Sequence, residues 1–185
     1  ALLEYKKDGC EVYNSAKMTL EEVIAVMAPA AKAGKTVVRL HTGDPCVYGA
    51  HREQMDELDK RGIPYEVCPG VSSFCGAAAA LKAEYTLPNV SQSVILTRME
   101  GRTPVPEKEQ IESFAAHGAT MVIFLSAGQL ARLSERLIAG GYAPDTPAAI
   151  VYKATWPDEK VVRTTVADLA AAGAREGITK TALIT

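Results

Sequence analysis

Residues 37–49 read VVRLHTGDPCVYG, and this stretch decides the fold that we expect of the chain. Residues 37–40 are mostly β-branched or apolar, as in a short buried strand. Gly43 and Pro45 then end the strand, because glycine permits backbone geometry that other residues avoid and proline lacks a backbone donor. Open α/β sheets bind ligands in loops at the carboxyl ends of their strands. The stretch therefore predicts either a ligand-binding loop or an ordinary turn from a strand into a helix.

Signals for strands and helices alternate on both sides of this stretch. Thr19 and Glu22 form a capping-box pattern, which predicts a helix that begins at Thr19. Further helices are expected at residues 50–61, 72–81, 106–117 and 129–139 and after Asp168, and further strands at residues 63–68, 94–97, 120–125, 148–152, 160–165 and 181–185. Such alternation is typical of α/β folds.

The polar, proline-bearing residues 86–93 (TLPNVSQS) interrupt this alternation. Aperiodic segments of this kind connect domains. We expect an N-terminal α/β domain at residues 1–86, a linker at residues 87–93 and a C-terminal α/β domain at residues 94–185. Each half is expected to be an open sheet flanked by helices.

The composition argues against several classes of protein. A net charge of −2 and a pI of about 6.0 give no basic field, which disfavours a protein that binds nucleic acid or an anionic membrane. No apolar run approaches the length of a transmembrane helix, and no G-x-G-x-x-G string marks a nicotinamide site. The four cysteines form no C-x-x-C pair and no zinc spacing with the three histidines. They indicate reduced thiols in a cytoplasmic protein with no metal site, and we expect Cys68 and Cys75 to be buried.

Four strings together resemble one enzyme family. Residues 41–49 (HTGDPCVYG) and 68–73 (CPGVSS) are similar to motifs of the tetrapyrrole methylases, which are two-domain α/β enzymes that use S-adenosylmethionine. Residues 97–106 (TRMEGRTPVP) and 151–160 (VYKATWPDEK) resemble the members that methylate carbon 11 of a corrin-ring precursor, precorrin-4 or cobalt-precorrin-4, in cobalamin biosynthesis. The resemblance implies a tetrapyrrole methylase fold, an S-adenosylmethionine-dependent methyltransferase and a homodimer.

The resemblance also implies which residues contact the cofactor. They lie in loops and at strand ends, where backbone amides are accessible: Thr42, Gly43, Asp44, Val47, Ser72, Ser73, Leu125, Ala154 and Ala182. Methyl transfer from a sulfonium is an in-line displacement with an activated donor, so the enzyme mainly aligns the donor and acceptor carbons. We therefore name no catalytic residue. The Asp44 carboxylate either binds the cofactor or caps the helix that follows.

The substrate that the resemblance implies is an anionic tetrapyrrole. Arginine pairs with carboxylates in two-point geometry, and lysine offers a point charge. Arg98, Arg102 and Lys153 are the candidates, because they lie in the two most specific strings. The alternative for each is a solvated surface charge. Neither a nucleic acid nor a membrane is expected as a partner.

Family members begin with a strand that ends in a Gly-x-Gly-Pro-Gly-Asp loop, and this string is absent from the sequence. Two alternatives to an active corrin methyltransferase therefore stay open. One is a truncated, inactive fragment that folds and self-associates. The other is a related methylase that acts on another substrate.

Overall fold

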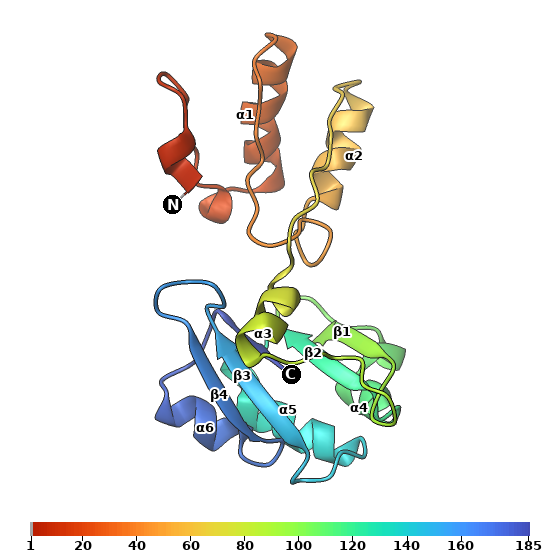
Figure 1. Ribbon diagram of the computed structural model, residues 1–185. Coiled ribbons are helices and arrows are strands. Elements are labelled where there is room, and N and C mark those ends of the chain that lie inside the picture. The colour runs from red at the N-terminus through yellow and green to blue at the C-terminus, as the bar shows by residue number, and fades with distance from the viewer. Residues whose placement is uncertain (1) are drawn as a thin grey trace. The chain divides into compact units, whose positions relative to one another are not determined.

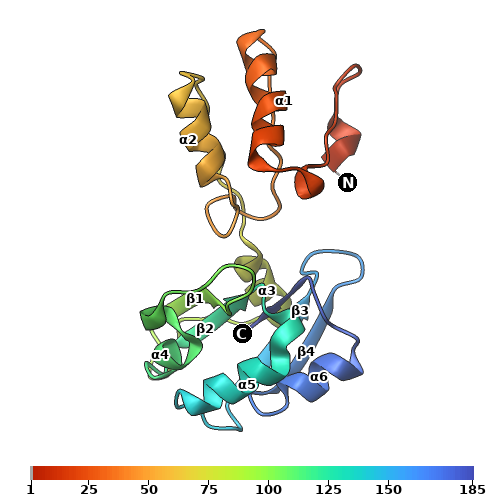
Figure 2. The same cartoon turned by 180° about the vertical axis from the view of Figure 1, so that it is seen from behind.

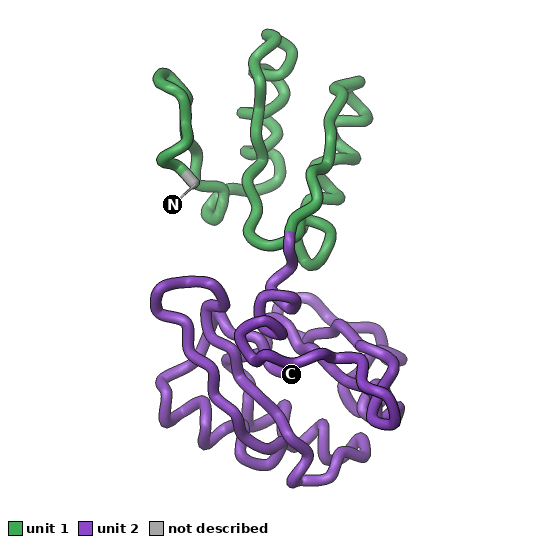
Figure 3. The backbone as a smooth tube through the Cα atoms, viewed as in Figure 1, with its two compact units in different colours: residues 1–70 green, residues 71–185 purple. Residues whose placement is uncertain are grey.

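The computed structural model describes residues 2–185. The chain divides into two compact units, residues 1–70 and residues 71–185, which Figure 3 shows in green and purple. The domain boundary expected at residues 87–93 stays a prediction, because a compact unit and a domain of the family need not coincide.

The first unit consists of short helices and extended segments. Its helical elements are η1 (Leu2–Tyr5), η2 (Ser15–Lys17), α1 (Leu20–Lys32) and α2 (Arg52–Lys60) (Figure 1). The capping box is confirmed: the Glu22 amide donates to Thr19 Oγ1 at 3.3 Å, and the Thr19 amide donates to Glu22 Oε2 at 2.8 Å. A small cluster of buried side chains, which includes Ile24, Leu58 and Ile63, joins the two α-helices.

The strands expected at residues 37–40 and 63–68 are wrong, because both segments form neither a helix nor a strand. A strand exists through ladder hydrogen bonds to a neighbour. Within the described chain, residues 36–41 and 64–69 make no backbone–backbone hydrogen bond. Their apolar side chains consequently stay exposed: Val38 is 76% exposed and Val67 is 42% exposed.

The second unit is an α/β layer structure. Its elements in order are α3 (Ser73–Leu81), β1 (Val94–Arg98), η3 (Glu107–Glu109), α4 (Ile111–Ala115), β2 (Thr120–Phe124), η4 (Ala127–Gln129), α5 (Leu130–Ala139), β3 (Pro147–Tyr152), β4 (Lys160–Thr165), α6 (Leu169–Arg175) and β5 (Ala182–Ile184). The five strands confirm the α/β class. The helix expected at residues 106–117 is divided, because Gln110 has an extended backbone (ψ 150°) between η3 and α4.

The five strands form one mixed sheet in the order β1-β2-β5-β3-β4. β1 and β2 are parallel, whereas β5 is antiparallel to both β2 and β3, and β4 is antiparallel to β3. Helices α4, α5 and α6 cover one face, and α3 lies on the other (Figures 1 and 2).

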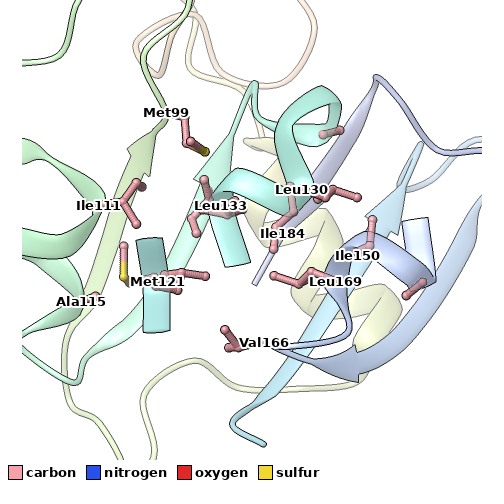
Figure 4. Close-up of a cluster of buried hydrophobic side chains, with 14 of the residues drawn as sticks. Met99, Ile111, Ala115, Met121, Leu130, Leu133, Ile150, Val166, Leu169 and Ile184 are labelled. Atoms are coloured by element: carbon pink, nitrogen blue, oxygen red, sulfur yellow. The ribbon is translucent and has the colours of Figure 1, made fainter. Parts of the chain in front are cut away.

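The core of this unit lies between the sheet and helices α4 to α6 (Figure 4). Leu133 of α5 and Leu169 of α6 are both fully buried, and they pack in one cluster with Met121, Ile150 and Ile184 of the strands. Burying large apolar side chains is the main source of folding free energy. This core fixes the strand ends that the candidate site uses.

Candidate functional site

One edge of the sheet gathers the carboxyl ends of β1, β2 and β3 and the amino ends of β4 and β5. We call it the strand-end edge. Four non-glycine residues beside it have positive φ: Leu125 (54°), Lys153 (47°), Thr155 (72°) and Thr181 (56°). Each such conformation costs about 1–3 kcal/mol, and such residues cluster at ligand sites. The strand-end edge is therefore the candidate site of the second unit.

The strand-end edge carries several of the residues that the sequence predicts for cofactor binding. Within the second unit these are Leu125 after β2, Ala154 after β3, Ala182 at the start of β5, and Ser72 and Ser73 at the start of α3. A Cβ built on Gly76 would lie 3.5 Å from the Cβ of Ala154, so the first turn of α3 packs beside the edge. The Ser72 side chain is buried and makes no capping bond to the helix. The cofactor roles of these five residues stay predictions.

The other predicted cofactor residues, Thr42, Gly43, Asp44 and Val47, lie in one loop of the first unit. Asp44 Oδ1 accepts from the Cys46 amide at 2.7 Å, and Asp44 Oδ2 accepts from the Gly70 amide at 2.8 Å. These two bonds lower the pKa of the Asp44 carboxyl, and the bond from Gly70 has the larger effect. The Asp44 carboxylate thus joins its own loop to the loop at residues 69–70. It does not cap a helix.

Two glycines outside the predicted cofactor residues permit close backbone approaches here, Gly70 between the two loops and Gly49 within the first loop. A Cβ on Gly70 would overlap the carbonyl oxygen of Gly43, and a Cβ on Gly49 would overlap the carbonyl oxygen of Pro45. The backbones thus approach more closely than any side chain allows. Tyr48 adopts a positive φ of 56°, as strained loops at binding sites do. The string HTGDPCVYG contains Gly43 and Gly49, and CPG contains Gly70, but only the folded backbone shows that Gly70 lies against Gly43.

The three residues predicted to bind the substrate differ in their contacts with the rest of the protein. Arg98 is used within its own loop, since it donates to Thr103 Oγ1 at 2.8 Å and to the Pro104 carbonyl at 3.1 Å. Lys153 Nζ lies 2.5 Å from Asp158 Oδ2 and 5.2 Å from the ring centroid of Trp156. Arg102 is exposed and forms no hydrogen bond or ion pair within the described chain. Of the three candidates, only Arg102 therefore has a charged group that is available to pair with a ligand.

The expected burial of Cys68 and Cys75 is wrong, because both thiols are exposed. Cys68 lies in the extended segment that pairs with no strand, so no layer covers it. Cys75 lies two residues before the buried Ala77, and a step of two residues places it on the opposite face of α3. All four cysteines are free thiols.

The second unit has an α/β fold, the class of fold in which enzymes bind ligands at the carboxyl ends of strands. The sequence profile of the tetrapyrrole (corrin/porphyrin) methylases matches residues 3–170, and the chain belongs to this family of methyltransferases. It is 57% identical over 183 residues to the cobalt-precorrin-4 C(11)-methyltransferase of Methanocaldococcus jannaschii. That alignment covers 99% of this chain and 71% of the relative.

Other relatives agree with this placement. The precorrin-4 C(11)-methyltransferase of Mycobacterium tuberculosis is 44% identical over 184 residues, which cover 99% of this chain and 73% of that protein. The X-ray structure of a cobalt precorrin-4 methyltransferase superposes with a TM-score of 0.95 at 50% identity, covering 99% of this chain and 77% of that one. A uroporphyrin-III C-methyltransferase from Thermus thermophilus, solved with S-adenosylhomocysteine, has a TM-score of 0.70 at 26% identity over 89% of this chain and 71% of that one.

Proposed function

We propose that this chain transfers the methyl group of S-adenosylmethionine to carbon 11 of cobalt-precorrin-4 in cobalamin biosynthesis. The observation that carries the proposal is the 57% identity to a cobalt-precorrin-4 methyltransferase over 99% of the chain. The cobalt-containing substrate is favoured over the metal-free one, because the cobalt-precorrin-4 relatives are 57% and 50% identical and a precorrin-4 relative is 44% identical. The solved relative with bound S-adenosylhomocysteine supports the choice of methyl donor.

The chemistry suits a site built from backbone and small side chains. The sulfonium supplies an activated methyl group, so the protein's task is to hold the donor methyl in line with the acceptor carbon. Gly43 and Ala154 leave room for a ligand to approach the backbone, and exposed amides at loop ends bind polar atoms of the cofactor. We assign no general base.

A calorimetric titration with S-adenosylhomocysteine tests the cofactor part of this proposal. Micromolar binding corresponds to a free energy of about −8 kcal/mol, which gives a measurable heat. Ligand that binds the folded state also raises the unfolding temperature. If saturating S-adenosylhomocysteine produces neither heat nor a thermal shift, this chain has no functional cofactor site and the inactive fragment is the better account.

Asp44→Asn is expected to weaken S-adenosylhomocysteine binding about tenfold, because the amide keeps one acceptor and turns an N–H₂ donor toward the second backbone amide. Since the pKa of Asp44 is lowered, the link between the loops holds fully above the ordinary value of 3.8 and is lost as the pH falls through the lowered pKa. Calorimetry of both proteins at neutral pH measures the effect. Asp56→Asn, which removes the exposed partner of Arg52, is the control, and full affinity in folded Asp44→Asn would remove the role of this link.

Arg102→Ala is expected to raise KM for cobalt-precorrin-4 about tenfold while leaving the affinity for S-adenosylhomocysteine unchanged. The reason is the loss of one charge-assisted, two-point bond to a substrate carboxylate. Steady-state methyl transfer at saturating donor gives KM. A selective loss of cofactor affinity would show instead that Arg102 belongs to the donor site.

Two further expectations enter the proposal. The cytoplasm suits an enzyme with four free thiols, and the homodimer rests on the family resemblance alone. Among residues 2–185, the helices are too short or too polar to cross a bilayer. Light scattering of the purified chain measures its oligomeric state.

A further inference from the structure

The loop at residues 98–106 carries Arg102, and its fixed ends depend on a residue far along the chain. Arg136 lies on α5, and its side chain is 13% exposed. Nη1 donates to both oxygens of Glu100, at 2.9 Å and 2.7 Å. Nε and Nη2 donate to the two oxygens of Glu112 at 2.6 Å and 2.5 Å. One guanidinium therefore holds the start of the loop and the start of α4 at the same time.

The far end of the loop is held through the same guanidinium. Arg136 Nη2 also donates to Gln110 Oε1, and Gln110 Nε2 donates to the carbonyl oxygen of Val105 at 3.1 Å. The bond from Arg136 orients the side-chain amide of Gln110, so Arg136 also fixes the carbonyl of Val105 through Gln110. Removing the fork of Arg136 therefore removes one tether from each end of the loop, whereas Arg132 of α5 still pairs with Glu100.

Additional bonds fix the base of the loop and brace part of its tip. The Met99 amide donates to Ser126 Oγ at 2.9 Å, and Gln129 Nε2 donates to the Glu100 carbonyl at 3.1 Å. Inside the loop, the guanidinium of Arg98 braces Thr103 and Pro104. What remains exposed is the segment from Gly101 to Pro104, with Arg102 near its centre.

We propose that Arg136 is a positioning residue, which fixes the 98–106 loop so that Arg102 meets a carboxylate of the tetrapyrrole substrate. This inference rests on the proposed function for its substrate. Two-point pairing requires the guanidinium of Arg102 to lie in one place and orientation, and a loop without fixed ends would lose that geometry. The guanidinium of Arg136 contacts all four carboxylate oxygens of Glu100 and Glu112, and these contacts hold the loop that presents Arg102.

A double-mutant cycle between Arg136 and Arg102 tests the proposal. Arg136→Lys keeps a positive charge beside Glu100 and Glu112, so the protein should fold, but an ammonium cannot span both carboxylates. We expect Arg136→Lys to raise KM for cobalt-precorrin-4 about fivefold with kcat within about twofold, since KM alone changes when uniform substrate binding is lost. In an Arg102→Ala background, the same substitution should change KM by less than about twofold, because the two residues act as one unit. Arg52→Lys, on α2 of the first unit, is the control.

Equal KM effects of Arg136→Lys in the two backgrounds would overturn the proposal, because Arg136 would then act without Arg102. A second readout does not need turnover. Trypsin should cut after Arg102 about fivefold faster in Arg136→Lys than in the unchanged chain, since proteolysis follows local opening. An unchanged cutting rate would also overturn the proposal. If the unchanged chain methylates nothing, the proposed function fails, and the trypsin comparison still decides whether Arg136 fixes the loop.

Discussion

Gly70→Ala is expected to weaken S-adenosylhomocysteine binding about a hundredfold, the equivalent of about two lost hydrogen bonds to the ligand, because the added methyl group displaces the cofactor loop. The added methyl group would overlap the carbonyl oxygen of Gly43, which is backbone and cannot rotate away as a side chain does. The two loops must therefore separate, and the bond from the Gly70 amide to Asp44 Oδ2 is strained or lost. Calorimetric titration with S-adenosylhomocysteine measures the loss of affinity.

Gly101→Ala is the matched control for this substitution. A Cβ at Gly101 meets no atom within 4 Å, and Gly101 is not among the residues with positive φ. The control should bind S-adenosylhomocysteine like the unchanged chain. Wild-type affinity in folded Gly70→Ala would show that the contact between the two loops is not part of the cofactor site.

Leu133→Ala is expected to lower the free energy of unfolding of the second unit by about 3 kcal/mol, since removing a buried leucine side chain loses transfer free energy and leaves a cavity. Leu133 is 0% exposed and lies in the core cluster under the sheet (Figure 4). Denaturant unfolding, followed by circular dichroism, gives the change. The strand-end edge depends on this core, so methyl transfer should also be lost at a lower temperature.

Leu125→Ala provides the comparison, because Leu125 is 72% exposed in the same unit. We expect it to change the free energy of unfolding by less than about 0.5 kcal/mol. An equal loss in both variants would mean that the second unit is not stabilised by the cluster around Leu133.

Much of the second unit could be predicted from its sequence, because its signals are local. The strand from residue 160 to residue 165 and the hairpin that contains it follow from β-branched runs on either side of a turn. The helix from Thr19 in the first unit is likewise local, since one capping box defines its start. The segments at residues 37–40 and 63–68 have equally clear strand composition and form no strand. Pairing is a non-local property, and composition cannot supply the neighbouring strand.

The candidate site was predictable as motifs but not as contacts. The Gly-Asp-Pro string predicted a role for Asp44. The partner of Asp44 Oδ2 is the amide of Gly70, 26 residues away, which the string does not indicate. Arg136 gave no sequence signal, because Glu112 and Glu100 lie 24 and 36 residues from it. A helical arginine with apolar neighbours resembles any surface charge until the fold brings its partners together.

The most direct measurement is methyl transfer to cobalt-precorrin-4 from S-adenosylmethionine labelled with ¹³C in its methyl group. The account predicts that this chain adds one labelled methyl group and that carbon NMR of the product places it on carbon 11. Label at another carbon, or no label in a protein that binds S-adenosylhomocysteine, would contradict the account.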